Sequence, residues 1–312
     1  MITTVTLNPC IDKVVTVKEF KYGGLNRIKE SKIYPAGKGI NVGVAFKQLG
    51  GEVICLGINY QENGEIITNY LEQRAVNHDF VMVGGAVRTN LKVIELKENV
   101  MTEINESGYP VNNQQLQKLK NKLFTYASHG KIMVFSGSVP RGVGSNIYRD
   151  LITEVKRNNP ALKIILDTEG ELLLEGIKAK PWLIKPNKYE LEMTFNKKVT
   201  TKNDMVAVAR QIIKQGVEIV CVSLGAEGAL IVNYEEAYWS PGLSLEVKGT
   251  PGAGDSLVAG ICRATEQNLS LAEMLIRSVA AASASVIRPG TRLCQRKDYQ
   301  KFLLAIKLEK II

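Results

Sequence analysis

From about residue 130 onward, short apolar runs alternate with stretches of helical periodicity, and this alternation limits the possible folds more than any other feature. The apolar runs predict buried strands, and the residues between them repeat at the spacing of amphipathic helices. Strands joined by helices form a parallel sheet that is covered on both faces, so the sequence predicts the α/β class. The predicted strands are 131–139, 162–167, 181–187 and 217–225, with a hairpin at 228–233 and 236–240, and the predicted helices are 145–158, 204–216, 255–265 and 271–287.

The first third of the chain is less regular and predicts a small additional sheet. A helix, a strand and a second helix in 37–76 continue the alternation. Residues 88–105 instead predict two strands around a turn, and parts of 10–34 are also strand-like. We expect these segments to form a small β-sheet that projects from the main body. Because no linker sets it apart, the chain 1–312 is predicted to be a single domain.

The composition fits one large globular domain. Of the 312 residues, 45% are hydrophobic, which is enough for a substantial core. The chain begins without the features of a signal peptide, and no apolar stretch approaches ~18 residues, so we expect no membrane contact. The five cysteines are scattered and form no CxxC pair, which argues against disulfides and zinc and favours a cytoplasmic location.

The formal net charge of +9 indicates anionic partners. Because the basic residues form no block, the sequence favours anionic small molecules over nucleic acid. The densest basic run, 117–123, is typical of a solvated amphipathic helix. His78 and His129 each lie in a polar stretch just before a strand-like run, so we expect no histidine-based catalysis or metal site. The P-loop and nucleophile-elbow motifs are absent from the sequence, and no dinucleotide-binding fingerprint follows the first strand.

Polar motifs follow the predicted strands, and TPGAGDS at 250–256 is the most informative of them. It precedes a helix, so the backbone N–H groups of Ala253, Gly254 and Asp255 form an anion site together with the helix dipole. A carboxylate beside such a site is explained if Asp255 takes the proton of an attacking hydroxyl while the N–H groups hold a phosphoryl group. Alternatively, Asp255 is the N-cap of the helix, or both cap and base.

Residues 35–41, PAGKGIN, form a second glycine-rich segment before a helix. Gly37 and Gly39 would let the main chain approach a ligand closely, and Lys38 and Asn41 would add hydrogen-bond donors. An ordinary loop before a helix is the alternative interpretation.

Residues 185–192, KPNKYELE, place Asn187 and Glu190 on one face of a helix start. An amide oxygen and a carboxylate in this arrangement suit Mg²⁺ with bound waters. A capping box, with Asn187 as N-cap and Glu190 at N3, explains the spacing equally well.

Taken together and in their order, these motifs resemble the ribokinase-like (PfkB-type) sugar kinases over nearly the whole chain. The motifs are NPCID, AGKGIN, SGSVP, KPNKYELE, SLGAEGA and GAGDS. TLNPCID, GLNR and TEIN narrow the resemblance to the branch of 1-phosphofructokinase and tagatose-6-phosphate kinase. The resemblance implies a three-layer α/β/α domain with a mostly parallel central sheet. It also implies that the small sheet is a lid over the sugar, through which two subunits form a homodimer.

The resemblance assigns roles on the nucleotide side of the site. Asp255 matches the catalytic base, and the anion hole for the γ-phosphoryl group of ATP matches Gly252, Ala253 and Gly254. Asn187 and Glu190 match a motif that acts on Mg²⁺ through water, and Lys185 matches a lysine near the ATP phosphates. The segment along the nucleotide matches Ser223, Leu224, Gly225, Ala226, Glu227 and Gly228.

On the acceptor side, the resemblance assigns Asp12 to the sugar hydroxyls, because a carboxylate accepts from two adjacent hydroxyls. The same pocket would be lined by Gly37, Lys38, Gly39, Asn41 and Ser136. Arg27 and Arg88 match cations that hold a phosphate already on the substrate; surface salt bridges are the alternative for both. Ala36 departs from the GGKG of many relatives, which bears on the choice of sugar rather than on the reaction.

The resemblance therefore implies ATP- and Mg²⁺-dependent phosphorylation of a ketohexose monophosphate. Fructose 1-phosphate, phosphorylated at O6 to fructose 1,6-bisphosphate, is the first choice. Tagatose 6-phosphate, phosphorylated at O1, is the alternative, since both products carry phosphates at opposite ends of a ketohexose. A non-catalytic sugar-phosphate sensor with this fold is a further alternative, although the complete catalytic set argues against it.

Overall fold

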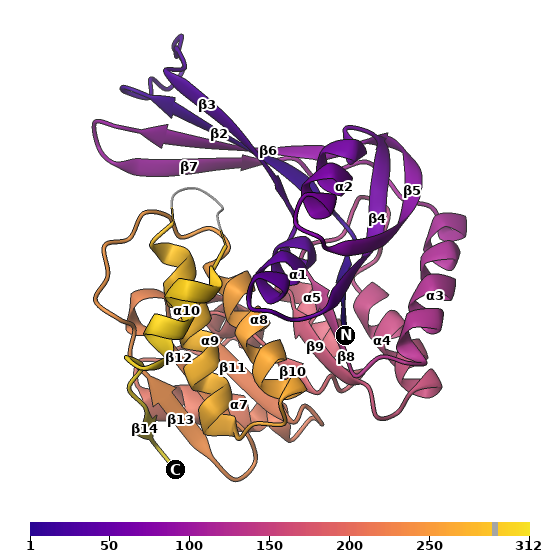
Figure 1. Cartoon of the computed structure of the whole chain (residues 1–312), viewed down its shortest axis with the longest axis vertical. Coiled ribbons are helices and arrows are strands. Elements are labelled where there is room, and N and C mark those ends of the chain that lie inside the picture. Colours follow the sequence, from indigo (N-terminus) through magenta and orange to yellow (C-terminus); the bar gives the residue numbers. More distant parts are fainter. Residues whose placement is uncertain (289–292) are drawn as a thin grey trace.

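The computed structural model describes residues 1–288 and 293–312, which form a large and a small β-sheet (Figure 1). The strands of the large sheet are β1 (Ile2–Thr6), β4 (Val53–Glu62), β5 (Asn77–Ala86), β8 (Ile132–Ser136), β9 (Lys163–Asp167), β10 (Leu183–Ile184), β11 (Ile219–Ser223), β12 (Ala229–Val232), β13 (Ala237–Ser240) and β14 (Glu309–Lys310). Their order is β14-β13-β12-β11-β10-β9-β8-β1-β4-β5. All strands from β11 to β5 are parallel, and β12 to β14 are antiparallel, so the predicted mostly parallel sheet is confirmed.

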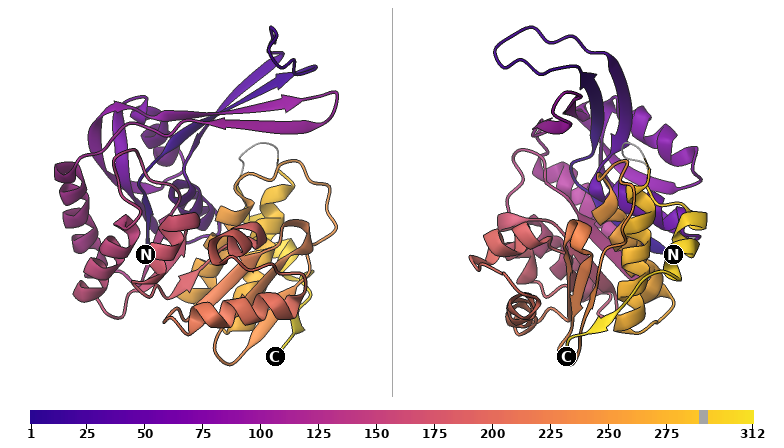
Figure 2. Two further views of the ribbon diagram at one scale, coloured as in Figure 1. Left: turned by 180° about the vertical axis from the view of Figure 1, so that it is seen from behind. Right: turned by 90° about the vertical axis from the view of Figure 1, so that its left-hand side faces the viewer.

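Helices cover both faces of the large sheet and complete three layers (Figure 2). One face carries α1 (Lys38–Gln48), α2 (Gly64–Glu72), α8 (Ala253–Glu266), α9 (Leu271–Val286) and α10 (Arg296–Leu303). The other face carries α3 (Asn113–Ala127), α4 (Ile147–Asn158), α5 (Gly170–Ile177), α6 (Lys188–Phe195) and α7 (Lys202–Ile213). Every residue of β1 and β8 is buried, as expected for central strands that are covered on both sides. No helix in the described residues is both long and apolar enough to cross a membrane.

The small sheet projects from the larger one in the order β3-β2-β6-β7 (Figure 1). Its strands are β2 (Cys10–Val17), β3 (Glu30–Ala36), β6 (Arg88–Glu95) and β7 (Val100–Asn105). This agrees with the predicted segments, except that β3 continues to Ala36. One face of the sheet carries a small apolar cluster of Val15, Val17 and Val93. By strand alternation, the opposite face presents Asp12 and Asn90.

Some elements differ from the sequence prediction. β10 contains two residues instead of a full run, because prolines flank it at 181 and 186 and cannot donate to a ladder. The strand-like run predicted after His78 is confirmed as β5, but this strand begins at Asn77, so His78 lies inside it rather than before it. The predictions also lack α5 and α10, which are short, and α10 is mostly polar.

The carboxyl ends of three neighbouring strands meet in register. Thr6 of β1 pairs with Ser136 of β8, and Ser136 pairs with Asp167 of β9. On the other side of β1, Thr6 pairs with Gly57 of β4. Ligands bind at this edge of open α/β sheets, so the register places polar side chains where a site is expected.

Gly57 allows β4 to approach the end of β1, and we predict that Gly57→Ala strongly destabilises the protein. Its φ is +135°, and an added Cβ would lie 1.8 Å from the carbonyl oxygen of Thr6, so backbone would have to move. We expect the free energy of unfolding in urea to fall by at least ~3 kcal/mol. Gly84→Ala in β5, where a Cβ meets nothing within 4 Å, is the matched control and should change it by less than ~1 kcal/mol. Equal losses from both variants would contradict the steric explanation.

Candidate active site

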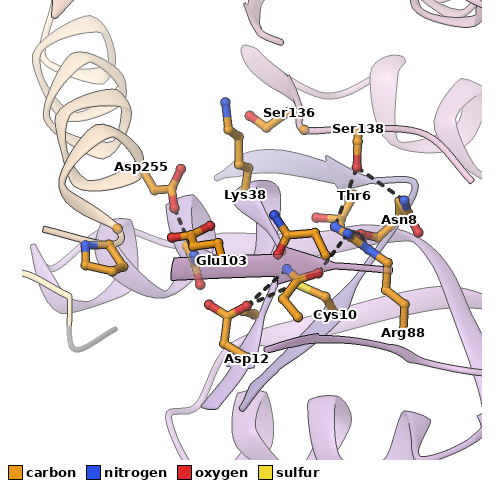
Figure 3. A pocket seen from close by; sticks show the side chains of 18 of the residues that line it. Thr6, Asn8, Cys10, Asp12, Lys38, Arg88, Glu103, Ser136, Ser138 and Asp255 are labelled. Atoms are coloured by element: carbon orange, nitrogen blue, oxygen red, sulfur yellow. Dashed lines mark hydrogen bonds between the residues drawn. The ribbon is translucent and has the colours of Figure 1, made fainter. Parts of the chain in front are cut away.

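A cavity of about 680 Å³ lies between the carboxyl ends of the central strands and the small sheet (Figure 3). Segments far apart in the sequence contribute to its walls, including β1, the start of α1, β6, the end of β8 and the start of α8. The predicted site residues that line it are Asp12, Gly37, Lys38, Asn41, Arg88, Ser136, Gly252 and Asp255. The structure therefore brings six of the eight predicted acceptor-side residues and the predicted base together in one space.

Asp255 lies in the first turn of α8 but does not cap it. The N-cap is Gly252, with a φ of 83°, and no side chain accepts a hydrogen bond there. The N-cap interpretation of Asp255, alone or combined with catalysis, is therefore wrong. The glycine is needed because this left-handed conformation is unfavourable for residues with a Cβ. The aspartate side chain is left facing the cavity (Figure 3).

The start of α8 retains free backbone donors. The N–H of Ala253 donates to the carbonyl of Thr250 at 3.2 Å, so it is already engaged. Within the described residues, the N–H groups of Gly254 and Asp255 donate to no backbone carbonyl, as is usual for a first turn. These two amides and the positive end of the helix dipole can hold an anion.

The Asp255 carboxylate is buried and held from one side. Asn41 of α1 donates from Nδ2 to Asp255 Oδ2 at 2.8 Å, which leaves Oδ1 free to accept from another group. Burial, followed by the negative charge of Asp167, raises the pKa of Asp255 to about 6, against the opposing effects of Lys38, Asn41 and Lys185. A carboxylate with this pKa is ionised at neutral pH and is a stronger base than an exposed aspartate.

Two lysines share one buried carboxylate beside the cavity. Asp167 Oδ1 lies 3.4 Å from Lys38 Nζ and 3.3 Å from Lys185 Nζ. Burial alone would raise the pKa of Asp167, but Lys185 and Lys38 outweigh it and hold the pKa below its ordinary value. The carboxylate in turn raises the pKa of Lys38, so the Lys38 ammonium remains charged. Sequence reasoning did not single out Asp167; its place at the end of an apolar strand was the available signal.

Asp12 lies on the cavity face of the small sheet within a polar cluster. Its Oδ2 accepts from Lys92 Nζ at 2.8 Å, and its Oδ1 accepts from Asn90 Nδ2 at 3.1 Å. Sequence reasoning also missed Asn90 and Lys92. Their alternation with Arg88 along β6 places all three on one face, and this periodicity could have revealed them.

Arg88 enters the same cavity from the start of β6 (Figure 3). It donates to Asn90 Oδ1 at 3.0 Å and to the carbonyl oxygens of Glu106 and Asn8. Within the described residues it forms no ion pair, so the salt-bridge alternative does not account for it. A half-buried guanidinium without a carboxylate partner suits an anionic ligand.

Asn187 and Glu190 form the capping box of α6. Asn187 Oδ1 accepts from the Glu190 N–H at 2.7 Å, and Glu190 Oε2 accepts from the Asn187 N–H at 2.8 Å. The capping interpretation is thus confirmed, and it leaves Glu190 Oε1 available. No cluster of three or more metal-ligating side chains occurs in the part of the chain described. One carboxylate oxygen fits a Mg²⁺ ion that keeps most of its waters and binds phosphate oxygens.

The predicted nucleotide segment follows β11 directly. Ser223 ends that strand and forms a bridge with Asn187, which joins the two nucleotide-side motifs. Gly225–Glu227 forms a single 3₁₀ turn, which Gly228 ends with a φ of 90°. An added Cβ at Gly228 would lie 1.9 Å from the carbonyl oxygen of Ser240, so this turn packs tightly on its neighbour.

Two predicted acceptor-side residues lie away from the cavity, and of the nucleotide-side set Ala253, Gly254, Lys185, Asn187, Glu190 and residues 223–228 do not line it either. Gly39 faces β1, where an added Cβ would lie 2.5 Å from Thr6 Oγ1, so its small size serves packing of α1 rather than ligand approach. Arg27 lies in the exposed segment between β2 and β3 and does not line the cavity. Its role stays a prediction.

Comparison with known proteins shows what the chain is similar to in sequence and in fold. The model of the pfkB family of carbohydrate kinases matches residues 5–298. A 1-phosphofructokinase of Borreliella burgdorferi is 32% identical over 312 residues, covering 100% of this chain and 99% of the relative. Phosphofructokinase-2 from Escherichia coli, solved with substrates and products, is 30% identical with a TM-score of 0.91, covering 97% of this chain and 98% of that one. Ribokinase from Thermotoga maritima shares the fold at 20% identity, with a TM-score of 0.79 and coverage of 97% and 99%.

Proposed function

The chain belongs to the pfkB family of carbohydrate kinases, and from this premise we propose that it transfers the γ-phosphoryl group of ATP to O6 of fructose 1-phosphate. It is a phosphotransferase with an alcohol group as acceptor. Two findings support this substrate assignment. One is the similarity to a 1-phosphofructokinase, and the other is a buried site with groups that can bind an anion. The observation that carries the proposal is the Asp255 carboxylate, held by Asn41 beside the free amides of α8.

The chemistry follows from the positions of these groups. The acceptor hydroxyl of the sugar lies against Asp255 Oδ1, which takes its proton while Asn41 holds Oδ2. The oxygen of that hydroxyl bonds to the γ-phosphorus, and the bond from the γ-phosphorus to the bridging oxygen of ATP breaks, which releases ADP. The N–H groups of Gly254 and Asp255 and the ammonium groups of Lys38 and Lys185 stabilise the phosphoryl oxygens in transit.

The acceptor side suits a sugar that already carries a phosphate. Arg88 presents a guanidinium without a carboxylate partner among the described residues, and its planar donors match phosphate oxygens. Asp12, oriented by Lys92 and Asn90, accepts from the sugar hydroxyls. A neutral sugar would leave Arg88 without an ion-pair partner among the described residues.

We further propose that ATP acts with Mg²⁺, which Glu190 and Asn187 would hold through water. When bound, the ion neutralises phosphate charge. The capping box keeps both side chains in place, and Glu190 Oε1 is the free acceptor for a bound water.

The five cysteines are all free, which supports a reducing, cytoplasmic location.

We predict that kcat falls at acid pH because Asp255 becomes protonated; this fall is the acid limb of the pH profile. The base must be ionised, and its pKa is raised to about 6, so kcat should fall as pH falls through about 6 and stay level above it. Asp255→Asn should lower kcat by at least ~100-fold while sugar-phosphate binding, measured by calorimetry, stays within a few-fold. Asp204→Asn, also in a helix first turn but away from the cavity, is the matched control. Near-normal turnover of Asp255→Asn would remove the base assignment.

A substrate panel tests the acceptor. We expect kcat/KM to be highest for fructose 1-phosphate, lower for tagatose 6-phosphate and fructose 6-phosphate, and lowest for free fructose. Arg88→Met should raise KM for the phosphorylated sugars by about 10- to 100-fold through loss of charged hydrogen bonds, and hardly change that for fructose. Activity restricted to unphosphorylated sugars would overturn the phosphate-binding role of this arginine.

We propose that the small sheet is a lid, inserted in the single kinase domain 1–312, and that the protein is a homodimer through it. Apolar side chains on the face away from the cavity are exposed, including Ile33 (57%) and Ile104 (55%). Sedimentation should give twice the 34.4 kDa chain mass, and Ile104→Glu should favour the monomer. A wild-type monomer at assay concentration would contradict the dimer. The predicted phosphate contact of Arg27 requires movement of this sheet or a second copy.

A further inference from the structure

Asp167 is a buried carboxylate to which the reaction described above assigns no role. It ends β9 and is 1% exposed. Its Oδ1 is shared between Lys38, from the glycine-rich segment 35–41, and Lys185, which follows β10. The carboxylate thus joins the sugar side of the site to the nucleotide side.

Stability of the fold explains only one oxygen of this carboxylate. The second oxygen, Oδ2, is buried and accepts no hydrogen bond from the residues that the structure describes. A buried carboxylate is costly unless it is paired and its oxygens are hydrogen-bonded. Asp167 is paired through Oδ1 with Lys38 and Lys185, but Oδ2 has no partner among the described residues, which points to a role of this carboxylate beyond stability.

The two lysines flank the place where the phosphoryl group would move. Lys38 lines the cavity next to Asp255. Lys185 Nζ lies 3.7 Å from the position that a Cβ on Gly254 would occupy, beside the free amides of α8. Two ammonium groups this close repel each other, and the shared oxygen between them offsets the repulsion.

We propose that Asp167 is a positioning residue for phosphoryl transfer, which holds Lys38 on the acceptor side and Lys185 on the donor side of the moving group. The inference rests on the proposed kinase function. Small displacements of these two ammonium groups slow the reaction, because the negative charge that they stabilise develops in the transition state. Asp167 therefore acts through the two lysines and contacts neither the sugar nor ATP in this scheme.

The charge of Asp167 also acts on the base. The charged groups that face Asp255 are Asp167, Lys38 and Lys185, and Asn41 donates to it. Glu190 and Glu169 act on Lys38 in turn. Asp167 raises the pKa of Asp255, so its removal must lower that pKa and let the base stay ionised to lower pH.

The test is Asp167→Asn, assayed for kcat, both KM values and the pH profile. We expect kcat to fall by about 10- to 100-fold with a smaller change in KM, as for misplaced catalytic groups. The acid limb of kcat should move to lower pH by roughly half a unit or more. A purely structural role would leave this limb in place. Thermal unfolding checks that the variant is folded.

Two further variants make the test specific. Asp79→Asn removes a carboxylate that also pairs with a lysine, Lys122, on the edge strand β5, and should leave kcat and the acid limb unchanged. Asp167→Glu keeps the charge but displaces the shared oxygen, so kcat should fall with the acid limb unchanged. If Asp167→Asn fails to fold, Asp167→Ser replaces it, because it also removes the charge and carries the same expected shift of the acid limb. If the Asp167 variants keep the kcat of the unmodified protein, the positioning role is wrong and the proposed kinase function still stands. If the unmodified protein itself is inactive, the proposed kinase function is wrong.

Discussion

The burial of opposite charges at the carboxyl ends of the parallel strands is the constraint on which the rest of the site depends. Asp167 and Asp255 are buried carboxylates, and each is stable as an ion because lysines lie close by. One lysine, Lys38, is the first residue of α1, and the other, Lys185, directly follows β10, so α1 must pack tightly on β1 to place Lys38. The glycines on either side of Lys38, and Gly39 above all, therefore position this charge as well as allowing close packing.

The small sheet completes this arrangement from the opposite side of the cavity. One face carries apolar residues, and the other presents a cluster in which each charge has a partner, such as Asp12 with Lys92. Arg88 differs from this rule, because its donors go to carbonyl and amide oxygens and to no carboxylate within the described chain. The surplus of positive charge at this point agrees with a substrate that brings its own negative charge.

The α/β class and the small sheet could be predicted from the sequence because both rest on periodicity, which is a local property. Motif residues such as Asp255 and Asn41 were likewise predicted, but the hydrogen bond between them joins positions far apart in the chain. Asp167 and Lys92 carry no motif, so their importance appears when the fold brings partners to them. The strand after His78 was predicted, but its start at Asn77 was not, because polar residues open this edge strand.

The start of α8 differs from the side-chain cap that the sequence suggested, and this difference has a consequence for the helix. An aspartate at a helix start suggested a capping role, yet the helix begins at Gly252 with no side chain to satisfy its first turn. Helices without such a cap are less stable at that end, because their first amides lack partners. Here a phosphoryl oxygen can take the place of the absent side chain. The reactant is then a temporary cap of the helix that acts on it, and the helix end is complete for as long as the phosphoryl group is in the site.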